Sequence, residues 1–171
     1  MMRRVLPTAI AILVATLLQI GLAPYLAIGG VVPNFLLLVV VTLALVEGPV
    51  PGASAGFAAG LIFDLLGSGP VGPMVLVLTV TGYMAGLLHE HMFAEGWLLP
   101  LTVLAIAALG TSLAYGLLTD MLGAGGPFWL TFFTKMLPEA IYDTALGLLI
   151  YPWLARFLRQ DRPMTTFRRL A

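Results

Sequence analysis

Residues 52–72 read GASAGFAAGLIFDLLGSGPVG. Gly52, Gly56 and Gly60 follow one another at four-residue spacing, and Asp64 takes the next position of the same series. Residues four apart share one face of a helix, and glycines on that face let another helix approach closely, as helices do in membranes. The stretch therefore predicts an apolar helix that packs through its glycine face, within the chain or against a partner, and ends in a glycine-rich turn of residues 67–72.

Asp64 is a candidate functional residue, because an ionisable group within an apolar membrane segment is costly. The alternative is that Asp64 is wetted at the membrane interface, since it lies just before the glycine-rich turn. A carboxylate near a helix C-terminus meets the negative end of the helix dipole and needs a donor. We expect that donor among Asn34, Gln19 and Tyr142, or among the backbone amides of residues 67–72.

The composition is that of an integral membrane protein. Of 171 residues, 60% are hydrophobic and 9% are charged, and the mean hydropathy is +1.04, whereas a soluble chain has about 25% charged residues. The chain has no cysteine, which excludes disulfides, a thiol nucleophile and a thiolate metal site. Basic residues gather in the tails, so no nucleic-acid surface is expected. The arginine-rich tail, residues 156–171, is interpreted as a topology signal that contacts lipid headgroups.

Apolar runs separated by Gly- and Pro-rich breaks predict an all-α membrane protein with about six transmembrane helices in a single domain, residues 1–171. The expected spans are Val5–Leu22, Val31–Val46, Ala53–Leu66, Met74–Leu88, Trp97–Leu118 and Leu137–Leu158. A span needs about 20 apolar residues, so the second, third and fourth are short. Four spans with a re-entrant pair is the alternative.

The distribution of basic residues predicts the orientation. Seven of the eight lie near the two ends of the chain, so both termini are expected in the cytoplasm and the number of spans is expected to be even. This topology places a set of polar residues at one depth in the outer leaflet, where they form a candidate polar cavity. The set is Gln19, Asn34, Asp64, Glu139, Tyr142 and Asp143.

Other signals are weaker. Gly82 and Gly86 form a second close-approach face, and Gly72 joins the set of candidate packing or partner-binding glycines. His89, His91 and Glu95 indicate a solvated loop rather than a metal site, because side chains two apart on a helix point to different faces. No motif of a nucleophilic, nucleotide-binding or metal-dependent enzyme occurs, so we expect no enzyme, no cofactor and no metal.

Several motifs resemble the rod shape-determining protein MreD family. They are the run PNFLLL at residues 33–38, the run GFAAGLIFDLL at residues 56–66 followed by Gly72, the LQI at residues 18–20, and the YPWL at residues 151–154 before the arginines. The resemblance covers most of the chain. Asp143 stands where relatives often have asparagine after the tyrosine of the last span.

The resemblance implies a non-enzymatic inner-membrane subunit of the bacterial cell-elongation machinery. Such proteins bind the bitopic scaffold MreC, and through it connect MreB filaments to the glycosyltransferase RodA and its penicillin-binding transpeptidase in peptidoglycan synthesis. The family's fold is similar to the substrate-binding S-components of energy-coupling-factor transporters. Two functions therefore stand: an assembly subunit whose glycine faces dock the partner helix, or a solute-binding or transport subunit using the polar cavity. Close-packing glycines favour the first.

Overall fold

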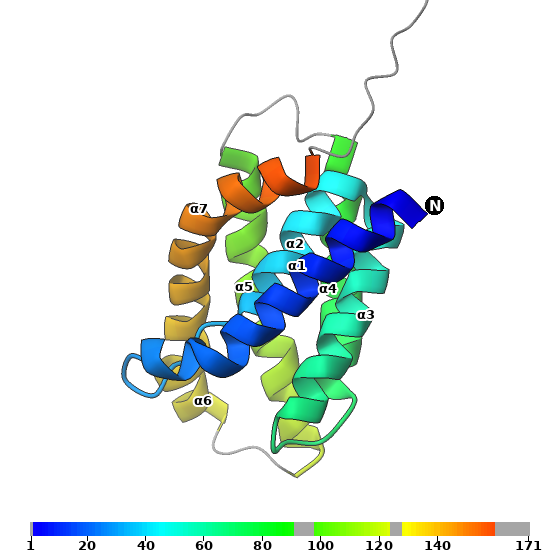
Figure 1. Cartoon of the computed structure of the whole chain (residues 1–171). Coiled ribbons are helices and arrows are strands. Elements are labelled where there is room, and N and C mark those ends of the chain that lie inside the picture. The colour runs from blue at the N-terminus through cyan, green and yellow to red at the C-terminus, as the bar shows by residue number, and fades with distance from the viewer. Residues whose placement is uncertain (1, 91–97, 124–127, 160–171) are drawn as a thin grey trace, which may run out of the picture.

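The computed structural model describes residues 2–90, 98–123 and 128–159. Over these ranges the chain is all-helical, and six helices of 13 to 24 residues run alternately up and down a bundle (Figure 1). They are α1 (Met2–Gly21), α2 (Phe35–Glu47), α3 (Pro49–Leu66), α4 (Pro73–Leu87), α5 (Leu98–Met121) and α7 (Leu137–Arg159). The start of α1 and the end of α7 lie at the same end of the bundle, which is the arrangement that an even number of spans requires (Figure 1).

The helix ends differ from the expected bounds in ways that local chemistry explains. α2 begins at Phe35, because Asn34 caps it and Val31 forms an isolated β-bridge with Ile28. α3 begins at Pro49, four residues earlier than expected, since a proline in the first turn of a helix has no hydrogen-bonded N–H to lose.

Three short elements were not expected from the sequence. A 3₁₀ helix (Ala23–Leu26) follows α1, and α6 (Phe128–Thr131) runs through a π-helical turn (Phe132–Met136) into α7. Aromatic rings gather on this segment, where Phe132 contacts Phe128, Trp129 and Phe133. Tryptophan is enriched at membrane–water interfaces, and Trp129 on this segment is exposed, as in an interfacial element.

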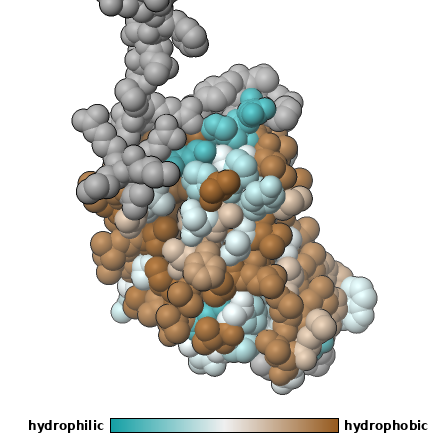
Figure 2. Space-filling model, turned by 90° about the vertical axis from the view of Figure 1, so that its right-hand side faces the viewer, coloured by the Kyte–Doolittle hydropathy of each residue, from teal (hydrophilic) through white to brown (hydrophobic). Residues whose placement is uncertain are grey.

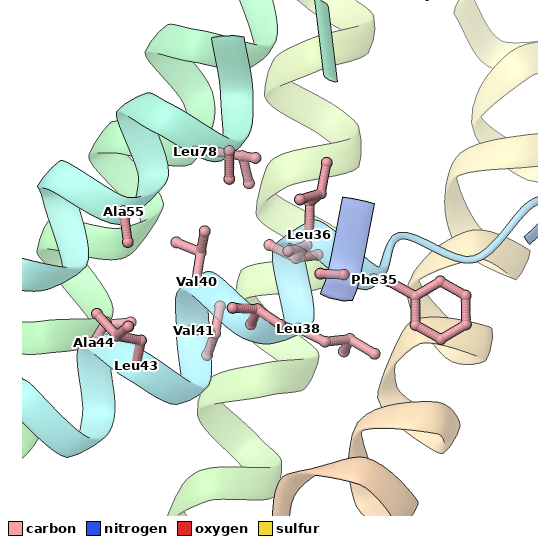
Figure 3. Close-up of a cluster of buried hydrophobic side chains, with 14 of the residues drawn as sticks. Phe35, Leu36, Leu38, Val40, Val41, Leu43, Ala44, Ala55 and Leu78 are labelled. Carbon is pink, nitrogen blue, oxygen red and sulfur yellow. The ribbon is translucent and has the colours of Figure 1, made fainter. Parts of the chain in front are cut away.

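The core is built around α2. Every residue from Phe35 to Val46 is buried, and the helix packs against α1, α3, α4, α5 and α7. Figure 3 shows its Val40 and Ala44 side chains near Leu78 of α4 and Ala55 of α3. A helix that is apolar on all sides is buried either in a protein core or in a membrane, and here the other helices enclose it. Because protein surrounds α2, the length of this short helix need not match the thickness of the bilayer.

The outer surface of the bundle is apolar as well. Hydrophobic residues cover most of the face in Figure 2, and Ile106 on α5 is 72% exposed. In the described part of the chain, two helices are long and apolar enough to cross a membrane, Pro49–Leu66 and Leu99–Met121, while the apolar helices Leu6–Gly21, Phe35–Glu47 and Pro73–Leu87 are shorter. The number of crossings and the side on which the termini lie stay predictions.

Candidate functional site

The N-terminal end of α2 is capped by two amide side chains. Asn34 precedes the helix, and its Oδ1 accepts the N–H of Leu37 at 3.0 Å, as an N-cap residue does. Gln19 on α1 accepts the N–H of Phe35 at 2.9 Å and donates to the carbonyl of Pro33 at 3.1 Å. Backbone amides at the start of this enclosed helix thus gain the partners that a helix cannot supply for itself.

Asp143 on α7 completes this cap. Its Oδ1 accepts the N–H of Asn34 at 2.8 Å, and its side chain is 0% exposed. The neighbouring Tyr142 donates its hydroxyl to the carbonyl of Leu26 at 2.9 Å. α7 is therefore bonded both to the segment after α1 and to the start of α2, and four of the six predicted cavity residues lie together.

Glu139 lies one turn before Asp143 and is half-buried. It is within hydrogen-bonding reach of Ser112 on α5. Tyr115, one turn further along α5, interacts electrostatically with Glu139 and with Asp64. Tyr115, which the sequence did not single out, is thus within electrostatic range of both acids, and its ring packs edge-to-face with that of Phe63 on α3.

Asp64 caps a different helix. Its Oδ2 accepts the N–H groups of Gly72 at 2.8 Å and Val75 at 3.2 Å, and its Oδ1 accepts the N–H of Met74 at 3.3 Å. The expected turn amide, that of Gly72, is therefore a partner, and the first turn of α4 supplies the others. Over the described ranges its hydrogen bonds include none to the three side chains considered as donors. Asp64 is only 4% exposed, which argues against a wetted interfacial position.

These bonds change the interpretation of the polar residues. Asn34, Asp64 and Asp143 are buried, and the bonded oxygens of all three accept backbone N–H groups. Four of the six polar residues thus bond the starts of two helices: Gln19, Asn34 and Asp143 bond the start of α2, and Asp64 bonds the start of α4. Such an arrangement holds helices in place and leaves fewer free groups for a solute.

The glycine face of α3 packs against α4 of the same chain. A Cβ added to Gly52 would lie 2.5 Å from the carbonyl oxygen of Gly82, and one added to Gly60 would lie 2.6 Å from that of Met74. A Cβ on Gly56 would overlap the carbonyl of Leu78. This face is closed by the chain's own backbone, so of the two alternatives, packing within the chain or against a partner helix, the geometry fits the first.

The second glycine face belongs to the same contact. A Cβ added to Gly82 would overlap the carbonyl of Gly52, and one added to Gly86 would overlap the backbone of Pro49. Gly72, by contrast, has no atom within 4 Å of an added Cβ and takes a positive φ of 124° at the N-cap of α4. It is a turn residue whose N–H bonds Asp64, and it takes no part in the close contact of α3 with α4.

His89 is a residue whose role the sequence did not reveal. Its Nδ1 lies 2.7 Å from the carbonyl oxygen of Leu45, near the C-terminal end of α2. Polar side chains from other parts of the chain thus bond both ends of α2. His91 and Glu95, considered with His89, lie outside the described residues. The described part of the chain contains no group of three potential metal ligands.

Two apolar grooves open on the outside of the bundle. One, of about 410 Å³, lies between α4 and α5, and is called here the α4–α5 groove. The other, of about 360 Å³, lies among α1, α2 and α7, and is called the α1–α7 groove. None of the helix-capping residues lines either groove.

Comparison with known families decides the identity. Residues 2–160 match the model of the family described as rod shape-determining protein MreD. The chain belongs to the MreD family. Membership makes it a membrane protein of cell-shape determination, as the sequence motifs predicted. Searches of curated proteins and of solved structures find no match, so the resemblance of the MreD fold to transporter S-components stays a prediction.

Asparagine at position 143 is expected to leave this MreD protein at least as stable as aspartate does. The Oδ2 of Asp143 is buried and has no hydrogen-bond partner among the described residues. Asparagine keeps the acceptor for Asn34 and carries no charge, and an unpaired buried amide costs far less than an unpaired buried charge. Asp143→Ala removes the acceptor and should lose about 1–3 kcal/mol. Thermal unfolding in mild detergent would compare Asp143→Asn with Asp143→Ala. An equal loss of stability in both variants would show that the charge of Asp143 is itself needed.

Proposed function

We propose that this MreD-family protein is a non-enzymatic inner-membrane subunit of the cell-elongation complex that binds an MreC-like bitopic protein. Through that partner it supports cell shape and peptidoglycan synthesis, in a complex with MreB, RodA and a penicillin-binding transpeptidase. Its whole length, residues 1–171, acts as one transmembrane domain with both termini in the cytoplasm. Family membership supports the class of function, and the α4–α5 groove supports the mode of binding.

The α4–α5 groove has the surface that a single transmembrane helix needs. Small residues Ala107, Gly110 and Ala114 follow one another on α5 at helical spacing and line the groove together with Thr81 and Ala85 of α4. Thr81 and Thr111 share a hydrogen bond of 3.1 Å, which satisfies their hydroxyls within the protein. The remaining lining is apolar and comprises Leu76, Val77, Val80, Met84, Leu88, Val103 and Ile106.

Gly110 distinguishes this groove from the glycine faces inside the bundle. No atom lies within 4 Å of a Cβ added to Gly110, whereas Gly52, Gly56 and Gly60 are closed by backbone. Small residues let a partner helix approach to close van der Waals contact, which is what drives association where lipid is as apolar as the side chains. The open small-residue face, rather than the buried one, is thus the better surface for the partner.

The solute-binding alternative has less support. It needs free polar groups in a cavity, whereas four of the six predicted cavity residues, Gln19, Asn34, Asp143 and Asp64, form hydrogen bonds at the starts of α2 and α4. The grooves that do open are apolar in their lining. The assembly function requires only apolar surface and is therefore preferred.

Gly110→Leu is expected to weaken binding of the MreC-like partner by about tenfold to a hundredfold while the protein stays folded. This loss of affinity corresponds to an overpacking cost of about 1–3 kcal/mol at a filled interface. Co-purification from membranes measures binding, and thermal unfolding in detergent measures stability. Gly21→Leu is the matched control, because Gly21 also lies in a helix with no atom within 4 Å of an added Cβ. Equal partner recovery for the two variants would reject the α4–α5 groove as the docking surface.

A further inference from the structure

The last two turns of α7 lie across one end of the bundle. Figure 1 shows the helix bending there, and Pro152 lies inside it. A proline within a helix removes one hydrogen bond and kinks the axis. After the bend, Ala155 and Leu158 are buried in the core, while Trp153 is 81% exposed. The segment is therefore amphipathic, with one side on the bundle and the other side turned outward.

The outward side of this segment borders the α1–α7 groove. Trp153, Leu154 and Phe157 line the groove from α7. α1 and α2 complete an apolar lining with Ile10, Ala11, Val14, Ala15, Leu18, Phe35, Leu38 and Val39. An exposed tryptophan beside an apolar groove near the end of a helix bundle is typical of the membrane–water boundary.

A basic residue adjoins the lining of the groove in sequence. Arg156 is exposed, and it directly precedes Phe157 and follows Trp153 by three positions, both of which line the groove. In the part of the chain that the structure describes, no carboxylate pairs with it. The sequence adds Arg159 one turn later and Arg3 and Arg4 in the first turn of α1. Arg156 thus supplies a positive charge beside residues that line the groove.

We propose that the α1–α7 groove binds one anionic glycerophospholipid, with an acyl chain against α1 and α7 and the phosphate at Arg156. The apolar lining alone cannot select a lipid, because every acyl chain offers the same surface. Selection comes from the charge, since each arginine near an anionic headgroup favours it about fivefold. A partner helix is a poorer occupant, because its apolar span would leave the arginine without an acceptor. This site is separate from the α4–α5 groove and does not depend on it.

The test uses Trp153 as a reporter in full-length protein. The chain has three tryptophans, so Trp97→Phe with Trp129→Phe leaves Trp153 alone. The protein is placed in nanodiscs of phosphatidylcholine with a minor fraction of phosphatidylglycerol, with bromine on the acyl chains of one lipid or of the other. Bromine quenches only a nearby tryptophan, so the ratio of the two quenching values reports which lipid occupies the site.

We expect phosphatidylglycerol to quench Trp153 about fivefold more than its share of the lipid predicts. Arg156→Gln should remove the excess, and Lys135→Gln, in the π-helical turn near the opposite end of α7, should keep it. A second protein that retains only Trp129, which lies on α6, should show no excess. Quenching in proportion to lipid composition at Trp153, or an excess that survives Arg156→Gln, would overturn the proposal.

Discussion

Gly56→Ala is expected to lower the stability of the protein by about 1–3 kcal/mol or more, and Gly56→Leu to yield no folded protein. The added Cβ would overlap the carbonyl oxygen of Leu78 and lie 2.9 Å from the amide nitrogen of Thr79. These are backbone atoms, which cannot rotate away, so α3 and α4 would have to separate. The gain in helix propensity from glycine to alanine, about 1 kcal/mol, is too small to offset this.

Gly110→Ala is the matched control for this experiment. It is the same substitution in the middle of a helix, and open space surrounds the added Cβ. Only the gain in helix propensity then remains, so Gly110→Ala should be neutral or stabilising by up to about 1 kcal/mol. Thermal and denaturant unfolding in detergent would measure both variants. Equal stability of the two would show that the close approach of α3 and α4 does not hold the fold together.

Asp64→Ala is expected to lower stability by about 1.5–3 kcal/mol, the range for a lost hydrogen bond to a charged group. The carboxylate accepts three backbone N–H groups around the start of α4. Without it, those amides lose their acceptor at a buried helix N-terminus, and the favourable charge at the positive end of the helix dipole is lost. Asp64→Asn should be milder, because the amide oxygen keeps one acceptor.

Asp120→Ala is the control for Asp64, because Asp120 is an exposed acid near the end of α5. It should change stability by no more than about 0.5 kcal/mol. The same variants should be tested for restoring rod shape in depleted cells. If Asp64→Ala were as stable as Asp120→Ala and yet failed to restore shape, Asp64 would act on a ligand or on the partner complex and not as a cap.

Local sequence patterns were sufficient to predict the main helices and the close packing of the glycine face of α3. Four-residue glycine spacing is visible in one segment, and it anticipates close packing whatever lies opposite. The spacing does not predict which helix packs on this face, and the structure was needed to identify that helix as α4. Gly72 shows the same limit, since a turn glycine with positive φ and a packing glycine look alike in sequence.

The bonds of the polar residues were harder to predict, because they depend on where distant segments meet. Asp143 and Asn34 are 109 positions apart, and no local pattern connects them. The predicted topology places both residues near one end of the bundle, but it does not predict that they form a hydrogen bond. The bond of His89 could not be predicted for the same reason, since the carbonyl of Leu45 that it meets lies 44 positions away on α2.

Site-specific cross-linking tests the central proposal most directly. The chain has no cysteine, so a single cysteine can be placed at Val80 or Ile106 in the α4–α5 groove. Leu149 on α7 serves as the control position, because it is 67% exposed and lines neither groove. With a cysteine series along the transmembrane helix of the MreC-like partner, we expect cross-links from Val80 and Ile106 at helical spacing and none from Leu149. Cross-links from Leu149 with none from the groove positions would contradict the account.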